Sequence, residues 1–249
     1  MMTRRLWLSL PASTLLAQDA RKIIQEVQSR SRSASQRYEG TLRVVDGRNR
    51  IAEKSWRYDR VGSFGESKTL LRFTAPAEVK GVALLIHNHP DRASDQWMWT
   101  PSLQRDRRIA LQDRSTRFFG TDFSFEDLEE RDVEQFDYRV LADESIDGAA
   151  CWKLESKPRP GKSSQYTRSY VWVRKDIFAF VRVEGWGKDA VARRIAYGDL
   201  ENVKGIWTAR TLEVFDEKRK SRTVLKVDKL EYNVPLKEDD FTLQALRRG

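Results

Sequence analysis

The chain contains only two histidines, His87 and His89, at the end of an apolar run. Residues two apart in a β-strand point to the same face of the sheet, so both imidazoles could face one metal ion. Asp91 follows nearby, but no third ligand stands at a metal-binding spacing. The pattern is more typical of a polar strand end. We therefore predict no metal site.

Nucleophilic and phosphate-binding chemistry also lacks support. The sequence holds no G-x-S-x-G, no G-x-G-x-x-G and no P-loop motif. The single cysteine, Cys151, lies in a strand-like run without a C-x-x-C pair, and we expect it to be buried as a small apolar residue. The acidic stretch Glu126–Glu134 is expected to be a solvated helix face. The sequence thus predicts a protein that is not an enzyme and needs no cofactor.

Basic residues outnumber acidic ones, 46 to 37, for a net charge of +9 over 249 residues. Acidic residues interleave throughout, which argues against a nucleic-acid partner. A local cluster of arginines is better suited to anionic lipid headgroups or an acidic protein, or it is a solvated edge that discourages strand pairing. The cluster comprises Arg105, Arg107, Arg108, Arg114 and Arg117.

The N-terminus has the three-part layout of a secretory signal. A short basic start is followed by the apolar run Leu6–Leu16 and then by the small residue Ala17. Eleven residues are too few to cross a bilayer as a helix. We predict a signal peptide over residues 1–17 and a mature protein in the periplasm; the alternative is an N-terminal core helix.

One amphipathic helix and a long series of strands follow. Ala20, Ile23, Ile24 and Val27 recur at helical spacing, with Asp19 as the expected N-cap, and the helix should end within Ser29–Ser35. From Tyr38 onward the period is two, with turn signals such as Asp46-Gly47 between the runs. Thirteen strands are expected, over 38–45, 51–60, 68–75, 82–89, 96–101, 107–111, 137–145, 149–157, 165–175, 178–186, 192–199, 205–216 and 222–233.

This order is that of an antiparallel meander, because no helices alternate with the strands as a parallel sheet would need. Long alternating strands form either a sandwich or a wide, partly closed barrel. No Pro- or Ser-rich linker divides the chain, so residues 18–249 are expected to be a single domain.

The segment Ser115–Glu134 interrupts the strand rhythm. Ser124 and Asp127 resemble a capping box that opens a short helix. Bulky rings on a loop and short helix suit a lid over an apolar cavity; equally, they could be ordinary core anchors under a long loop. The candidate lid residues are Phe118, Phe119, Phe123 and Phe125.

Several of these segments resemble one known family, the outer-membrane lipoprotein-sorting proteins related to the LolA and LolB periplasmic lipoprotein carriers. The resemblance rests on Trp97–Pro101, Arg107–Ile109 and Phe118–Leu128, together with Tyr38–Leu42 and Lys237–Leu246. It covers the chain from about residue 19 to the end. It implies a half-open antiparallel β-barrel with an N-terminal helix, and a short lid helix or loop over a cavity that holds acyl chains.

The alternation of the strands agrees with such a cavity. Hiding an acyl chain from water stabilises it by roughly 0.8 kcal/mol per buried CH₂, and an apolar wall achieves this without chemistry. Same-face pairs on five successive strands could form that wall. The candidate cavity residues are Leu42, Val44, Trp56, Tyr58, Leu71, Phe73, Leu84, Ile86, Trp97 and Trp99.

Two functions from different classes remain open. The first is a periplasmic carrier of lipid or lipoprotein acyl chains to the outer membrane. Such a carrier would meet an inner-membrane transporter, an outer-membrane acceptor and, transiently, a membrane surface. The alternative is a non-catalytic regulatory or adaptor module of the same fold that serves an envelope transport complex. A carrier hands its lipid over, whereas a regulator binds a signalling protein and transfers nothing.

Overall fold

The structure, a computed structural model, describes residues 12–90, 92–131 and 133–248. In this part of the chain thirteen antiparallel strands form a single sheet in the order β6-β5-β4-β3-β2-β1-β13-β12-β11-β10-β9-β8-β7. The strands are β1 (Ser35–Val45), β2 (Ile51–Ser63), β3 (Glu66–Ala75), β4 (Ala83–Asn88), β5 (Asp95–Thr100), β6 (Arg105–Arg108), β7 (Phe136–Ile146), β8 (Ala149–Pro158), β9 (Arg168–Arg174), β10 (Phe180–Trp186), β11 (Val191–Val203), β12 (Ile206–Asp216) and β13 (Ser221–Tyr232).

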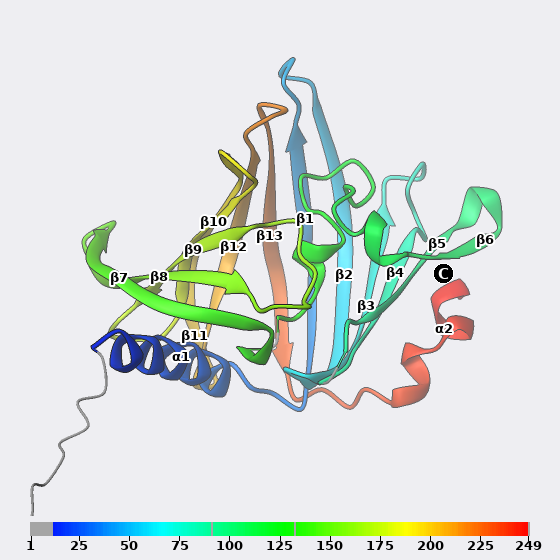
Figure 1. The fold of residues 1–249 in the computed structure, drawn as a ribbon. Coiled ribbons are helices and arrows are strands. Elements are labelled where there is room, and N and C mark those ends of the chain that lie inside the picture. The colour runs from blue at the N-terminus through cyan, green and yellow to red at the C-terminus, as the bar shows by residue number, and fades with distance from the viewer. Residues whose placement is uncertain (1–11, 91, 132, 249) are drawn as a thin grey trace, which may run out of the picture.

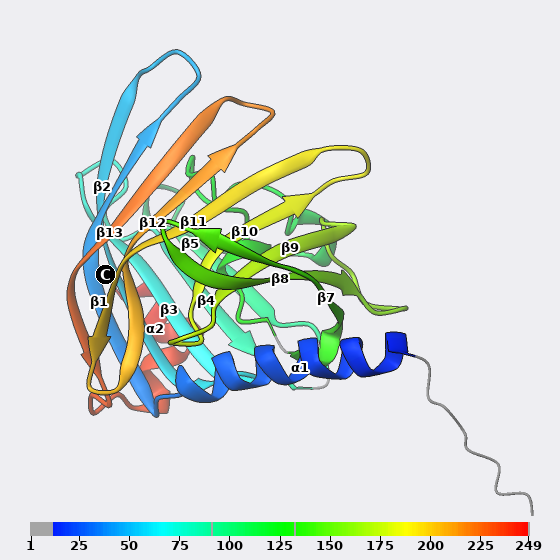
Figure 2. The same cartoon turned by 90° about the vertical axis from the view of Figure 1, so that its left-hand side faces the viewer.

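Each of the thirteen predicted strands is confirmed, within a few residues at its ends. The sheet curves strongly on itself, as Figures 1 and 2 show, but remains open, because β6 and β7 form its two edges and do not pair. The strands β1 and β13 pair along their length. They join the first half of the sheet, β1–β6, to the second half, β7–β13. The expected half-open antiparallel architecture is therefore confirmed as an open curved sheet.

The helix α1 (Ala12–Arg30) lies along the concave side of the second half of the sheet (Figure 2). Ala20, Ile24 and Val27 are buried there against Leu154 and Val171. The predicted apolar stripe is thus confirmed. The predicted N-cap is wrong, because Asp19 lies inside the helix.

The signal-peptide prediction falls largely on residues 1–11, which lie outside the described residues. The remainder of the predicted signal, from Ala12 to Ala17, belongs to α1. The buried contacts described between α1 and the sheet involve Ala20, Ile24 and Val27, which follow the predicted cut.

The C-terminal segment covers the opposite, convex face of the first half of the sheet. Phe241 and Leu246, the latter on helix α2 (Leu243–Arg247), are buried against Leu85 and Trp99. Arg72 donates to the carbonyl oxygens of Ala245 and Leu246, both at 3.0 Å, and so fixes α2 to β3.

The segment that connects the two sheet edges, residues 109–135, is the green stretch between β6 and β7 in Figure 1. The expected lid helix is reduced to a single 3₁₀ turn, Glu126–Leu128. Its predicted capping box does form: the amide and hydroxyl of Ser124 donate to Asp127 Oδ2 at 2.8 and 2.7 Å. The expectation of a solvated acidic helix over Glu126–Glu134 is wrong, because this stretch is a loop with short 3₁₀ turns, and the carboxylates of Asp127, Glu129 and Glu130 turn inward.

Candidate functional site

Eight of the ten candidate cavity residues share one concave surface on β1–β4. They pack in a single apolar cluster that comprises Leu42, Val44, Trp56, Tyr58, Leu71, Phe73, Leu84 and Ile86. The other two candidates, Trp97 and Trp99, do not continue this wall. In the β4–β5 register they pair with Leu85 and Ala83, so they face the convex side, under α2. A one-residue offset exchanges the faces of a strand, and Gln96 and Met98 occupy the concave side instead.

The lid phenylalanines fill this concave surface. The Phe118 ring stacks on Phe73, with 5.4 Å between centroids, and Phe125 meets Phe118 edge-on at 5.8 Å. Phe119 packs against the same cluster, and Phe123 is buried within the segment. The rings therefore serve as a plug in the first half of the sheet; whether they move as a lid stays a prediction.

Two cavities with largely apolar side chains in their linings lie in the second half of the sheet, beside α1. A first cavity of about 240 Å³ lies between α1, the 127–131 segment and strands β7–β11. Its apolar lining comprises Ile24, Phe64, Val171, Phe180, Val183 and Ile195. A second cavity of about 240 Å³ adjoins it towards β12 and β13 and has Leu200, Ile206 and Leu212 in its lining. Phe64, Phe180 and Tyr197 line both cavities, so the two form one interrupted hollow.

Three acidic residues of the segment between β6 and β7 border the first cavity, and each has its own arginine. Glu129 Oε1 lies 2.5 Å from Arg114 Nη1, and Glu130 forms an ion pair with Arg60. Asp127 Oδ2 lies 3.6 Å from Arg193 Nη1. Because such pairs are buried, removal of one partner leaves an uncompensated charge and is strongly destabilising.

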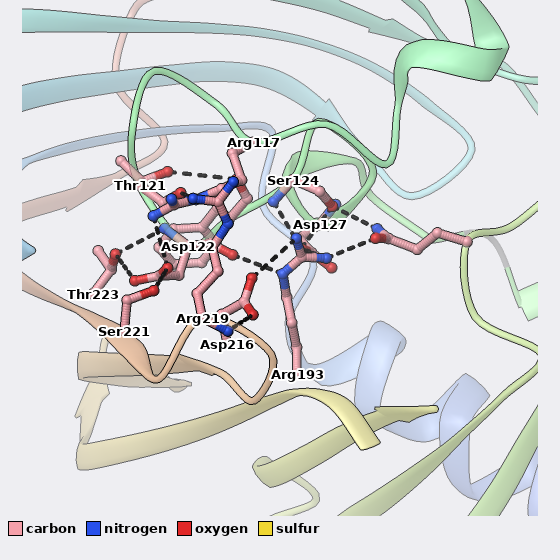
Figure 3. A network of polar contacts seen from close by, with 12 residues as sticks. Arg117, Thr121, Asp122, Ser124, Asp127, Arg193, Asp216, Arg219, Ser221 and Thr223 are labelled. Carbon is pink, nitrogen blue, oxygen red and sulfur yellow. Dashed lines mark hydrogen bonds and ion pairs between the residues drawn. The ribbon is translucent and has the colours of Figure 1, made fainter. Parts of the chain in front are cut away.

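A further polar network connects Asp122, in the segment between β6 and β7, to strands β11 and β13 in the second half of the sheet (Figure 3). The fully buried carboxylate of Asp122 accepts from Ser221 at 2.5 Å, Thr223 at 2.8 Å and Arg117 at 2.8 Å. Arg193, which rises from β11, donates through Nε to the backbone oxygen of Asp122 at 2.8 Å. The segment therefore packs its phenylalanine rings on the first half of the sheet and forms hydrogen bonds and ion pairs with the second half.

Burial governs the titration of two groups at this site. It raises the pKa of Glu129 to about 7, although the Arg114 charge opposes the shift. It also raises the pKa of Tyr166, whose hydroxyl donates to Asp127 Oδ1 at 2.8 Å. Both directions reflect the cost of a charge away from water.

The remaining candidate residues lie outside the hollow. His87 Nε2 lies 2.8 Å from the carbonyl oxygen of Phe241, and His89 Nε2 lies 3.0 Å from Asp95. Asp91 lies outside the described residues, within which no cluster of three or more metal-ligating side chains occurs. Cys151 is buried, as expected.

The predicted arginine cluster divides into two groups. Arg105, Arg107 and Arg108 are exposed on the edge strand β6. Arg114 and Arg117 instead turn inward to Glu129 and Asp122. Among the described helices, none has the length and apolar character needed to cross a membrane.

The sequence did not point to Arg60 or Arg193, nor to their pairing with Glu130 and Asp127. These partners are separated by scores of residues along the chain, so no local spacing connects them. The sequence does carry one indication that these acids are buried. Asp122 and Asp127 alternate with the apolar residues Phe123, Phe125 and Leu128, a pattern that fits a buried segment better than a solvated helix.

Comparisons with known proteins agree with this architecture. A family model described as an uncharacterized protein matches residues 65–248. A crystal structure described as an outer membrane lipoprotein-sorting protein domain, from Vibrio parahaemolyticus, is 26% identical; the match covers 93% of this chain and 100% of that one, with a TM-score of 0.88. A DUF1329 family protein from Desulfovibrio piger is 27% identical over 93% of this chain and 99% of that one, with a TM-score of 0.89.

A LolA superfamily protein from Nitrosomonas europaea shares the fold at 20% identity, over 89% of this chain and 98% of that one, with a TM-score of 0.69. A search of curated proteins found no match. The chain belongs to the family whose model matches residues 65–248, and it is similar to the outer membrane lipoprotein-sorting protein domain that its sequence motifs suggested.

Proposed function

We propose that this protein is a non-enzymatic periplasmic carrier that binds the acyl chains of a lipid or lipoprotein and transfers them towards the outer membrane. The observation that carries the proposal is the apolar hollow between α1 and the curved sheet, formed by two adjoining cavities. Ligand pockets commonly measure about 300–1,000 Å³, so an acyl chain would need both cavities. The description of the Vibrio relative as a lipoprotein-sorting domain supports the same function.

The lid segment supplies a route for entry. Its phenylalanines cover the concave surface of β1–β4, and its ion pairs lie at the border of the hollow. In the proposed cycle, release of this segment would join the hollow to the surface that the rings now cover. A transporter at the inner membrane and an acceptor at the outer membrane would be the donor and recipient of the cargo. The exposed arginines of β6 would contact the membrane surface in passing.

Binding and transfer are tested separately. A fluorescent fatty-acid probe should bind the mature protein and be displaced by phospholipid or an acylated peptide. Ile195→Asp, which places a carboxylate in the first cavity, should weaken probe binding at least about tenfold, because the charge must be desolvated. The matched control is Ile51→Asp, at a residue that is 53% exposed, and it should bind normally.

Transfer of a labelled lipid from donor to acceptor vesicles then separates a carrier from a regulator. The carrier should speed transfer in proportion to its concentration. A folded protein that binds no apolar probe would refute the proposal. Binding without transfer would favour the regulatory module.

A further inference from the structure

We infer that the first cavity recognises the anionic headgroup of a single-chain amphiphile, a carboxylate or a phosphate, through Arg131 and Tyr197. This inference rests on the proposed function, because it assigns the class of ligand to the same hollow. The apolar lining would hold the chain, and the two polar side chains would hold the head.

Arg131 is the cation of this cavity that lacks a direct partner. Its side chain lines the first cavity but forms no hydrogen bond or ion pair with any residue that the structure describes. The carboxylates beside it are already engaged, since Asp127, Glu129 and Glu130 each pair with another arginine.

The position of Arg131 is nevertheless well defined. Its guanidinium carbon lies 5.5 Å from the ring centroid of Phe136 and 5.6 Å from that of Tyr166. Its backbone oxygen accepts from Gln28 Nε2 of α1 at 2.8 Å. The guanidinium is therefore held between two rings while its N–H groups remain available to a ligand. A planar guanidinium presents paired donors that match carboxylate and phosphate oxygens.

Nearby carboxylates favour the charged form of Arg131. The charges of Glu126 and Asp127 raise its pKa above the ordinary value in spite of burial, although neither carboxylate forms an ion pair with it. Glu126 is itself bound by the hydroxyl of Ser164 and, at 2.8 Å, by the amide of Gln165.

Tyr197 supplies a second donor. It lies on β11, lines both cavities and has no side-chain hydrogen bond within the described part of the chain. Burial raises the pKa of its hydroxyl, so it stays protonated and can donate. Arg131 and Tyr197 both line the first cavity, so one ligand headgroup there could meet both side chains.

The chain of the amphiphile would follow the apolar linings of the two adjoining cavities. Phe180, Val183 and Ile195 line the first cavity beside the proposed headgroup site. The path passes Phe180 and Tyr197 into the second cavity, where Leu200 and Leu212 line the wall. This arrangement, one charged end and one apolar end, fits a fatty acid or a lysophospholipid better than a neutral acylglycerol.

The test compares three ligands with one matched chain. Oleate carries a carboxylate, 1-oleoyl-lysophosphatidate a phosphate, and 1-monoolein no charge. The wild-type protein at pH 8 should bind at least one of the anionic ligands about tenfold more tightly than monoolein, as expected for a hydrogen-bonded charge. Arg131→Gln should remove that preference and leave the affinity for monoolein unchanged.

Two further variants keep the inference falsifiable. Tyr197→Phe removes one hydroxyl and should weaken anion binding several-fold; it carries the test if Arg131→Gln does not fold. Arg48→Gln, at an exposed hairpin residue, is the control and should change nothing. The preferred anion, oleate or lysophosphatidate, identifies the headgroup as carboxylate or phosphate.

The outcomes separate this inference from the function on which it rests. If the wild-type protein binds all three ligands equally, the headgroup site is refuted and the carrier stands. The same holds if Arg131→Gln weakens monoolein as much as oleate, because the residue would then be structural. If none of the three ligands binds, the carrier proposal itself fails.

Discussion

At the scale of single residues, buried charges decide how the lid segment is held. Glu129 and Glu130 are consecutive, yet their side chains reach arginines on different parts of the chain, Arg114 and Arg60. Exposed pairs such as Arg174 with Asp176 stabilise a protein by at most about 1 kcal/mol. The buried pairs matter more because each charge has been removed from water and depends on its partner.

Glu129 makes the stability of the protein depend on pH. Burial raises its pKa to about 7 in the folded protein, whereas a glutamate in an unfolded chain titrates near about 4.3. Between these two values the folded state retains a proton that the unfolded state has lost. Stability should therefore fall as pH rises through this window and level off above pH 7, by up to about 4 kcal/mol from this residue alone.

Glu129→Gln isolates this contribution from the other carboxylates. The unfolding free energy of the variant minus that of the wild type should be about 2–3 kcal/mol larger at pH 8 than at pH 5. Urea denaturation at each pH measures both values. An equal difference between the two proteins at both pH values would show that Glu129 titrates normally.

At the scale of elements, the segment between β6 and β7 combines two roles that the sequence left open. Phe118 is 2% exposed and stacks on Phe73, as a core residue does. On its other side the same segment is attached by polar contacts through Asp122 and Asp127 and, near its end, by Val133, which is buried in the apolar cluster of α1.

Phe118→Ala should therefore lower the unfolding free energy by about 3–5 kcal/mol, the cost of a cavity in a packed core. Phe119→Ala, at a ring that is only partly buried against the same cluster, should cost less. Urea denaturation gives both values. A loss of under 1 kcal/mol in Phe118→Ala would mean that its ring contributes little to the core.

Hydrogen exchange addresses the motion of the segment. If residues 115–131 act as a lid, their amides should exchange faster than those of β1–β4, and a bound acyl chain should slow them. Exchange that is as slow as in the strands, with or without ligand, would identify a permanent plug.

At the scale of the whole molecule, the predicted cut after Ala17 would leave the described buried contacts of α1 in the mature protein. The buried side chains that attach α1 to the sheet, Ala20, Ile24 and Val27, all follow the predicted cut after Ala17. We expect the periplasmic fraction to contain a mature form that begins near Gln18, identified by N-terminal sequencing. A full-length form in the cytosol would contradict the prediction.

The sequence determined the elements because their signals are local. A period of two residues and turn dipeptides such as Asp46-Gly47 defined thirteen strands, and the spacing of Ala20, Ile24 and Val27 defined one helix face. The capping box of Ser124 and Asp127 was visible for the same reason, since its two residues are three apart.

Only the tertiary structure decided which faces meet. The alternation of Trp97 and Trp99 shows that both side chains face the same side of the sheet, but not which side. The register with β4 places them on the convex side, under α2. The hollow beside α1, the partners of Glu129 and Glu130, and the position of Arg131 arise from contacts between distant segments. Local periodicity predicts the conformation of a single segment. The pairing of buried charges and the location of the cavities depend on how the whole sheet curves, and no single segment determines that curvature.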